Sequence, residues 1–103
     1  MEEKRKIENR ELLQKVQSIK KQSQFIRACE NLGFRITNGG KHPYVVRDPD
    51  NLENGDFRSA VTTIPSHLHK IVNRKILEQI LNSPVSQRME VTEEKIEKAF
   101  GFL

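Results

Sequence analysis

Apolar residues near the start of the chain recur at helical spacing. The stretch 3–21 is highly charged, yet Leu12, Val16 and Ile19 follow one another at intervals of four and three residues. This spacing lines up side chains on one face of an α-helix, so the stretch predicts an amphipathic helix. The apolar stripe must be buried, either against the rest of the chain or against a second chain.

A second helix is predicted directly after the first. Ser23 can serve as its N-cap, and Gly33 provides a C-terminal stop. Between them the apolar residues again follow helical spacing, which turns one face toward a core. The expected inward positions are Phe25, Ile26, Cys29 and Leu32.

Three short β-strands are predicted next, because the chain changes to runs rich in β-branched and aromatic residues. We expect strands over about residues 34–38, 42–47 and 58–64. Two glycines after Asn38 can take the positive φ values of a tight hairpin turn. The acidic, turn-rich stretch 48–56 predicts a longer loop between the second and third strands.

Helical spacing returns in the last third of the chain. We expect a helix over about residues 73–82 that ends at Ser83-Pro84, and a short final helix that Thr92 caps. The order α, α, β, β, β, α, with the short helix last, predicts an α+β fold: a three-stranded antiparallel sheet with helices on one face. The apolar positions of the longer helix are Ile76, Leu77, Ile80 and Leu81.

Composition narrows the class of protein. With 103 residues the chain forms one small domain, and its net charge of +4 at pH 7 suits a polyanionic partner. Its single cysteine, Cys29, excludes an internal disulfide, and His and Cys are not clustered, so we expect no metal and no cofactor. No apolar run reaches the ~20 residues of a membrane span, and no signal peptide is visible. We therefore expect a soluble cytoplasmic protein.

The candidate catalytic residue is His42, which follows the glycine turn and opens the second predicted strand. RNA carries its own nucleophile, the 2′-hydroxyl, so cleavage needs only proton transfer and charge stabilisation. A histidine with an ordinary pKa of about 6.5 suits the proton transfer. Lys41 and Arg47 can supply positive charge, although strict strand alternation turns both away from His42. Tyr44, on the same face as His42, can stack on a base or donate its hydroxyl.

Further basic residues lie near the start of the last long helix. Lys70, Arg74 and Lys75 can bind phosphates, or they can form an ordinary solvated helix face. His67 and His69, just before them, are more simply explained as capping or solvent-exposed side chains.

Short motifs run through residues 23–82 in a fixed order. They are the helix end Leu32-Gly33-Phe34, the turn with Gly40 and His42, the strand end Asp48-Pro49, the strand end Ile64-Pro65 with His67, and the closing pair Ile80-Leu81. In order and spacing this series resembles the HicA toxin family of toxin–antitoxin systems. The resemblance leaves residues 1–22 and 83–103 as extensions on either side of a HicA-like core.

The resemblance implies a fold like that of double-stranded-RNA-binding domains and the activity of an mRNA interferase, a ribonuclease without a metal. It implies that His42 is catalytic, that the turn at Gly40 contacts RNA, and that a HicB-like antitoxin neutralises the protein. The chain departs from the family at Lys41, where serine is common, and at Pro43, where a second histidine or a polar residue is common.

Two other functions fit the same sequence. One is a non-catalytic RNA-binding module, for which the basic balance is sufficient; an inactive member of the family would belong here. The other is a protein-interaction domain that docks, or forms homo-oligomers, through the apolar stripe of its N-terminal helix.

Overall fold

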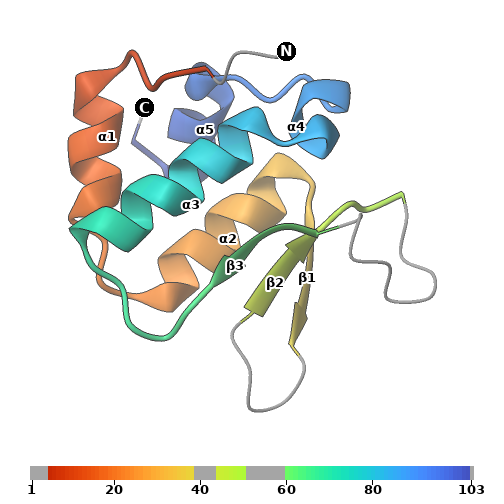
Figure 1. Cartoon of the computed structure of the whole chain (residues 1–103), viewed down its shortest axis with the longest axis horizontal. Helices are drawn as coiled ribbons and strands as arrows, with labels where there is room; N and C mark the ends of the chain where they lie inside the picture. Colours follow the sequence, from red (N-terminus) through yellow and green to blue (C-terminus); the bar gives the residue numbers. More distant parts are fainter. Residues whose placement is uncertain (1–4, 39–43, 51–59, 103) are drawn as a thin grey trace.

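The computed structural model describes residues 5–38, 44–50 and 60–102, and all structural statements below concern these residues. They form five helices and three strands (Figure 1). In chain order these are α1 (Arg10–Gln17), α2 (Gln22–Leu32), β1 (Arg35–Asn38), β2 (Tyr44–Arg47), β3 (Ala60–Ile64), α3 (Lys70–Asn82), α4 (Pro84–Arg88) and α5 (Glu93–Phe100).

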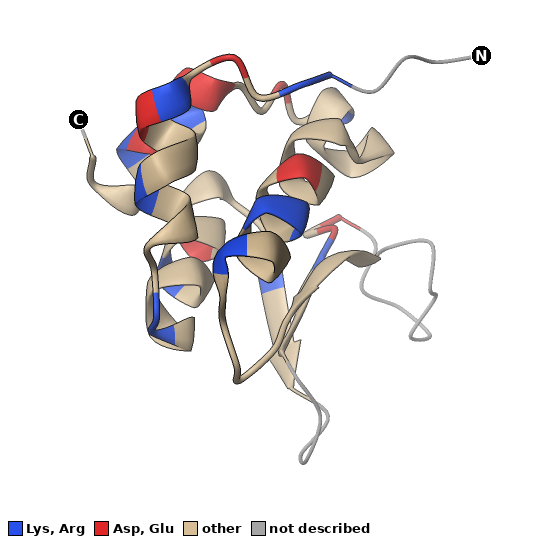
Figure 2. Ribbon diagram, turned by 60° about the vertical axis from the view of Figure 1, so that its left-hand side comes forward, with Lys and Arg blue, Asp and Glu red and all other residues tan. Residues whose placement is uncertain are grey.

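The three strands form one antiparallel sheet in the order β1-β2-β3. α2 and α3 pack on one face of this sheet, while α1 lies against α3 and α5 lies against α2, further from the strands (Figures 1 and 2). The predicted α+β fold with an antiparallel three-stranded sheet is therefore confirmed.

The register of the strands identifies the face that the helices cover. Ile36 lies opposite Val46, which in turn lies opposite Thr62. Val46 is completely buried, and the Thr62 hydroxyl donates a hydrogen bond to the side-chain carbonyl of Gln79 on α3. Since side chains alternate along a strand, Tyr44 shares this covered face, and Val45 and Arg47 belong to the opposite, open face.

The apolar stripe of the N-terminal helix is buried within the same chain. Leu12 and Val16 have no exposed surface, and Ile19 is also buried. They join the hydrophobic core that includes Val46 from the sheet and Ile96 from α5. Of the two alternatives for the stripe, packing against the rest of the chain is the one observed, and segments 1–22, 23–82 and 83–103 all contribute to one core.

The first helix is shorter than its apolar pattern predicts. It spans Arg10–Gln17 and not 3–21, because Asn9 acts as its N-cap by accepting a hydrogen bond from Leu12 N at 3.1 Å. The backbone N–H of Asn9 in turn donates to the carboxylate of Glu93 on α5 at 2.9 Å. This long-range contact fixes the chain outside the helix, so tertiary structure overrides helical spacing here.

The second helix begins at Gln22, so Ser23 lies inside it and the prediction of Ser23 as N-cap is wrong. The side-chain amide of Gln22 donates to the carbonyl of Ile64 at 2.8 Å, which anchors the first turn to the end of β3. The predicted stop is confirmed: Gly33 has φ 101°, a left-handed conformation that favours glycine.

The C-terminal third contains one more helix than predicted. α3 begins at Lys70, three residues before the predicted start, after His69 as N-cap. Ser83-Pro84 does end α3, but Ser83 also caps α4 by accepting from Ser86 N at 3.0 Å, and Pro84 occupies the first position of that helix, where its missing N–H costs nothing. Thr92 caps α5 as predicted.

Candidate nucleic-acid interface

The predicted catalytic turn falls outside the described residues. Gly40, Lys41, His42 and Pro43 all belong to it. The last described pair before this segment is Asn38 opposite Tyr44, where β1 and β2 face each other. The role expected for His42 therefore stays a prediction.

Tyr44 and Arg47 lie on opposite faces of the sheet, as strand alternation predicts. Tyr44 is partly buried and packs against the hydrophobic core. Arg47, on the open face, donates from Nε to the hydroxyl of Thr37 at 3.0 Å and lies opposite Arg35. Both arginines therefore contribute positive charge to the same corner of the open face.

The three basic residues predicted on the last long helix are all exposed, but they point in two directions. Lys70 and Arg74 are one turn apart and share a face. Arg74 also pairs with Glu78, Nε to Oε1 at 2.9 Å, with 61% of its own side chain exposed. Lys75 instead lines a groove of about 540 Å³ that α3 forms with Ala60 and Val61 of β3.

The two histidines of this segment have the ordinary roles that residue type suggests. His69 caps α3: its Nδ1 accepts a long hydrogen bond of 3.5 Å from Val72 N. His67 is exposed. Neither lies on the strands that flank the predicted catalytic turn.

Two lysines that sequence reasoning missed lie beside the start of α3. Asn73 donates from Nδ2 to the carbonyls of Val16 at 2.9 Å and Ile19 at 2.8 Å, which holds α3 against the end of α1. Lys20 and Lys21 follow Ile19 directly and are both exposed. The fold thus gathers two basic segments that are about fifty residues apart in sequence. We call Lys20, Lys21, Lys70 and Arg74 the basic end.

A signal for the basic end is present in the sequence, although residue spacing does not reveal it. Residues 12–29 contain four Lys or Arg and no Asp or Glu, and residues 60–77 contain three Lys or Arg and no Asp or Glu. The structure joins these two acid-free runs at two points: Asn73 of α3 donates to the carbonyl of Ile19 after α1, and Gln22 of α2 donates to the carbonyl of Ile64 at the end of β3. Clustered Lys and Arg are the electrostatic footprint of a polyanion-binding surface, and of the four cations here Arg74 also pairs with Glu78, which directly follows the second run.

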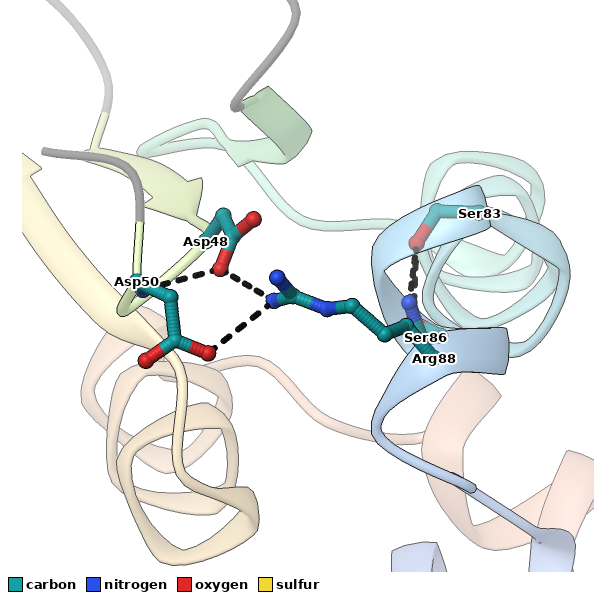
Figure 3. Close-up of polar contacts among 5 residues, drawn as sticks. All are labelled: Asp48, Asp50, Ser83, Ser86 and Arg88. Carbon is teal, nitrogen blue, oxygen red and sulfur yellow. Dashed lines mark hydrogen bonds and ion pairs between the residues drawn. The ribbon is translucent and has the colours of Figure 1, made fainter.

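Two carboxylates next to the sheet, those of Asp48 and Asp50, form ion pairs with an arginine of α4. Arg88, at the end of α4, forms ion pairs with Asp48 and Asp50, which follow β2 (Figure 3). Burial of Asp48 acts to raise the pKa of its carboxyl, but the backbone N–H of Asp50 and the guanidinium of Arg88 together outweigh burial, so this pKa is lowered. The cluster ties the C-terminal segment to β2 and is structural.

Two further kinds of site find no support in the described residues. Cys29 is buried, and burial, with a smaller contribution from Glu30, raises the pKa of its thiol to about 12, so it is a core residue and not a nucleophile. No three His, Cys, Asp or Glu side chains of the described segments come together to hold a metal ion.

Among the described helices, none is long and apolar enough to cross a membrane.

Comparisons with family models, with curated proteins and with solved structures found no match to this chain.

Proposed function

We propose that the chain is an RNA-binding domain that acts as a ribonuclease toxin of the HicA type. The observation that carries the proposal is the basic end, where two lysine- and arginine-containing runs of sequence meet with four exposed cations, of which Arg74 also pairs with Glu78. A phosphate backbone is the polyanion that best suits such a surface, because each contact releases counterions from the nucleic acid.

The order of elements supports RNA over DNA as the partner. α2, the three antiparallel strands and α3 follow one another with both helices on one face of the sheet. This is the order implied by the resemblance to double-stranded-RNA-binding folds. Such domains bind largely through phosphate and 2′-hydroxyl contacts and do not need deep base readout.

Cleavage is the part of the proposal that depends on His42. The 2′-oxygen of RNA forms a bond to the adjacent phosphorus as His42 takes its proton, and the bond from phosphorus to the 5′-oxygen of the next nucleotide breaks. The products are a 2′,3′-cyclic phosphate and a 5′-hydroxyl, whose proton comes from water or from the imidazolium of His42. Arg47 and Lys41 are the cations nearest to His42 in sequence that can offset the developing phosphorane charge. The substrate is mRNA in the cytoplasm, and a HicB-like antitoxin restrains the toxin by covering His42.

A second candidate is a non-catalytic RNA-binding module. The basic end favours it, since the four cations of that surface bind phosphates whether or not His42 is active. The third function considered from sequence, docking through the N-terminal stripe, loses its support because Leu12 and Val16 are completely buried.

The test is RNA cleavage by purified protein in the presence of a chelator. We expect the parent to cleave and His42→Ala to lose about 10²–10⁴ in rate, the usual contribution of general acid–base catalysis. His67→Ala replaces an exposed histidine and is the matched control. A folded His42→Ala variant that cleaves at the parent rate would move catalysis to another residue, whereas a parent that binds RNA without cleaving it would support the second candidate.

A further inference from the structure

The C-terminal segment presents an aromatic ring at the surface. Gly101, with φ 79°, ends α5, and the backbone N–H of Phe102 then donates to the carbonyl of Glu97 at 2.9 Å. This turn folds the chain back against α5, in the geometry of a Schellman cap. It holds the half-buried Phe102 ring beside Lys15 of α1.

The ring is built into a short aromatic stack. Phe102 lies nearly parallel to Phe100, at 7° with ring centroids 5.2 Å apart. Phe100 in turn meets the buried Phe25 edge to face at 5.5 Å, which connects the stack to the core. Lys15 places its ammonium 5.3 Å from the centroid of Phe102. Phe100 thus supports one face of the Phe102 ring, and the exposed Lys15 side chain lies over the ring. The ring can accept a flat ligand when Lys15 moves aside.

Two surface hollows meet at this ring. One, of about 350 Å³, lies between Phe102, Lys15 and Ser18, and the other, of about 190 Å³, lies between Phe102, Arg27 and Ser23. Gln24 lines both hollows and offers an amide with donor and acceptor atoms. The site thus combines an aromatic face, a polar group beside it and one cation in each hollow.

The charge around the ring continues that of the basic end. Lys15 and Arg27 belong to the acid-free run 12–29, which also contains Lys20 and Lys21. Ser18 and Ile19, which border the larger hollow, directly precede those two lysines. The larger hollow therefore connects Phe102 with the residues that lead directly into Lys20 and Lys21 of the basic end.

We propose that Phe102 stacks one base of a single-stranded stretch of RNA, with Lys15 and Arg27 on the flanking phosphates and Gln24 at the base edge. Aromatic faces that alternate with cations are the usual means of holding single strands with little sequence preference, because every base has a π-face. This inference rests on the proposed function, for it states how the same protein holds its RNA. It gives the C-terminal extension a role in substrate binding.

The experiment uses the absence of tryptophan from the chain. Phe102→Trp introduces a single tryptophan, whose fluorescence is quenched when a base stacks on it. The ligand is a 2′-O-methyl oligonucleotide, which keeps RNA geometry but cannot be cleaved, and the comparison ligand has the same phosphates with abasic sugars. We expect quenching by the first ligand only. Gln87→Trp, at an exposed position on α4, is the matched control and should respond to neither ligand.

A second measurement follows the binding of labelled oligonucleotide by anisotropy. Phe102→Leu keeps an apolar side chain against the core but removes the ring, and we expect it to weaken binding of the base-bearing ligand about fivefold to a hundredfold, with the abasic ligand unaffected. If the ligand binds but neither quenching nor this loss is seen, the stacking site is overturned and the proposed function stands. If no oligonucleotide binds at low salt, both are overturned. If stacking is seen without RNA cleavage, only the catalytic part of the proposed function fails.

Discussion

Asn73 is the buried polar residue that joins α3 to the end of α1. Its Nδ2 donates to the carbonyls of Val16 and Ile19, whereas its Oδ1 has no hydrogen-bond partner. Asn73→Ala should lower the free energy of unfolding by about 1–3 kcal/mol, because the buried carbonyls of Val16 and Ile19 lose their hydrogen-bond donor. Urea unfolding followed by circular dichroism measures this change.

The control for this prediction is Asn31→Ala, which removes a comparable side-chain bond to the carbonyl of Ala99, 2.9 Å long but exposed. We expect its effect to stay below about 1 kcal/mol, since water replaces the lost donor there. Equal effects of the two substitutions would mean that Asn73 has no special part in holding α1.

Asp48 makes the free energy of unfolding depend on pH in the acidic range. Burial alone would raise the pKa of its carboxyl, but the Asp50 N–H and the Arg88 guanidinium lower it below the unfolded value. A lowered pKa stabilises the fold above the unfolded value of about 3.9, and this contribution disappears as the pH falls through the folded value. Arg88→Gln should raise the Asp48 pKa toward its ordinary range, which a carbon-13 NMR titration of the carboxyl detects. An unchanged titration would leave Arg88 without influence on Asp48.

Residue type alone predicted some single-residue roles correctly and missed others. Cys29 as a core residue and Thr92 as a cap follow from short-range patterns, which the sequence contains in full. Lys20 and Lys21 could not be paired with Lys70 in this way, because their proximity depends on the bonds of Asn73 and Gln22 to distant carbonyls. Long-range hydrogen bonds of this kind leave no periodic trace in the sequence.

At the scale of elements, the types of helix and strand were predicted better than their ends. The first helix is shorter than its stripe because Asn9 and Glu93 fix the preceding chain. The sequence does not reveal α4, because the pair Ser83-Pro84 can either end one helix or begin the next. Here it does both, and the sequence alone does not distinguish these cases. Boundaries therefore depended on capping contacts, whereas the apolar patterns still identified the buried faces.

The buried stripe of α1 predicts that the N-terminal segment is needed for stability. Deleting residues before Ser23 removes Leu12, Val16 and Ile19 from the core, and the truncated protein should unfold at a clearly lower temperature. The milder variant Leu12→Ala should cost about 2–5 kcal/mol, as expected for a completely buried leucine. Thermal and urea unfolding provide the two measurements.

Glu11→Ala, at the exposed neighbouring position, is the control for Leu12→Ala and should change stability by less than about 0.5 kcal/mol. A truncated protein that kept the parent unfolding temperature but lost self-association in size-exclusion chromatography would show that the stripe packs against a second chain.

For the whole molecule, the sequence predicts the fold class correctly, but the residues it predicts to contact RNA lie on different surfaces. The order of helices and strands follows from local periodicity, and the antiparallel sheet follows because no crossover helix is predicted between consecutive strands. The predicted RNA contacts, however, separate: Tyr44 faces the core, Arg47 lies on the open face of the sheet, and Lys70 is exposed at the start of α3. Which surfaces coincide depends on how the layers pack, and periodicity alone does not specify that packing.

The basic end predicts a particular dependence of RNA binding on salt. The logarithm of the binding constant should fall linearly with the logarithm of salt concentration, by about 0.7 for each phosphate contact to a single strand. Lys70→Gln with Arg74→Gln removes two such contacts, so the slope should become shallower by about 1.4. Lys95→Gln with Lys98→Gln removes the same charge from α5, outside the basic end, and should leave the slope nearly unchanged. Equal shifts in the two double variants would mean that RNA responds only to the net charge of the protein and that the basic end is not its binding surface.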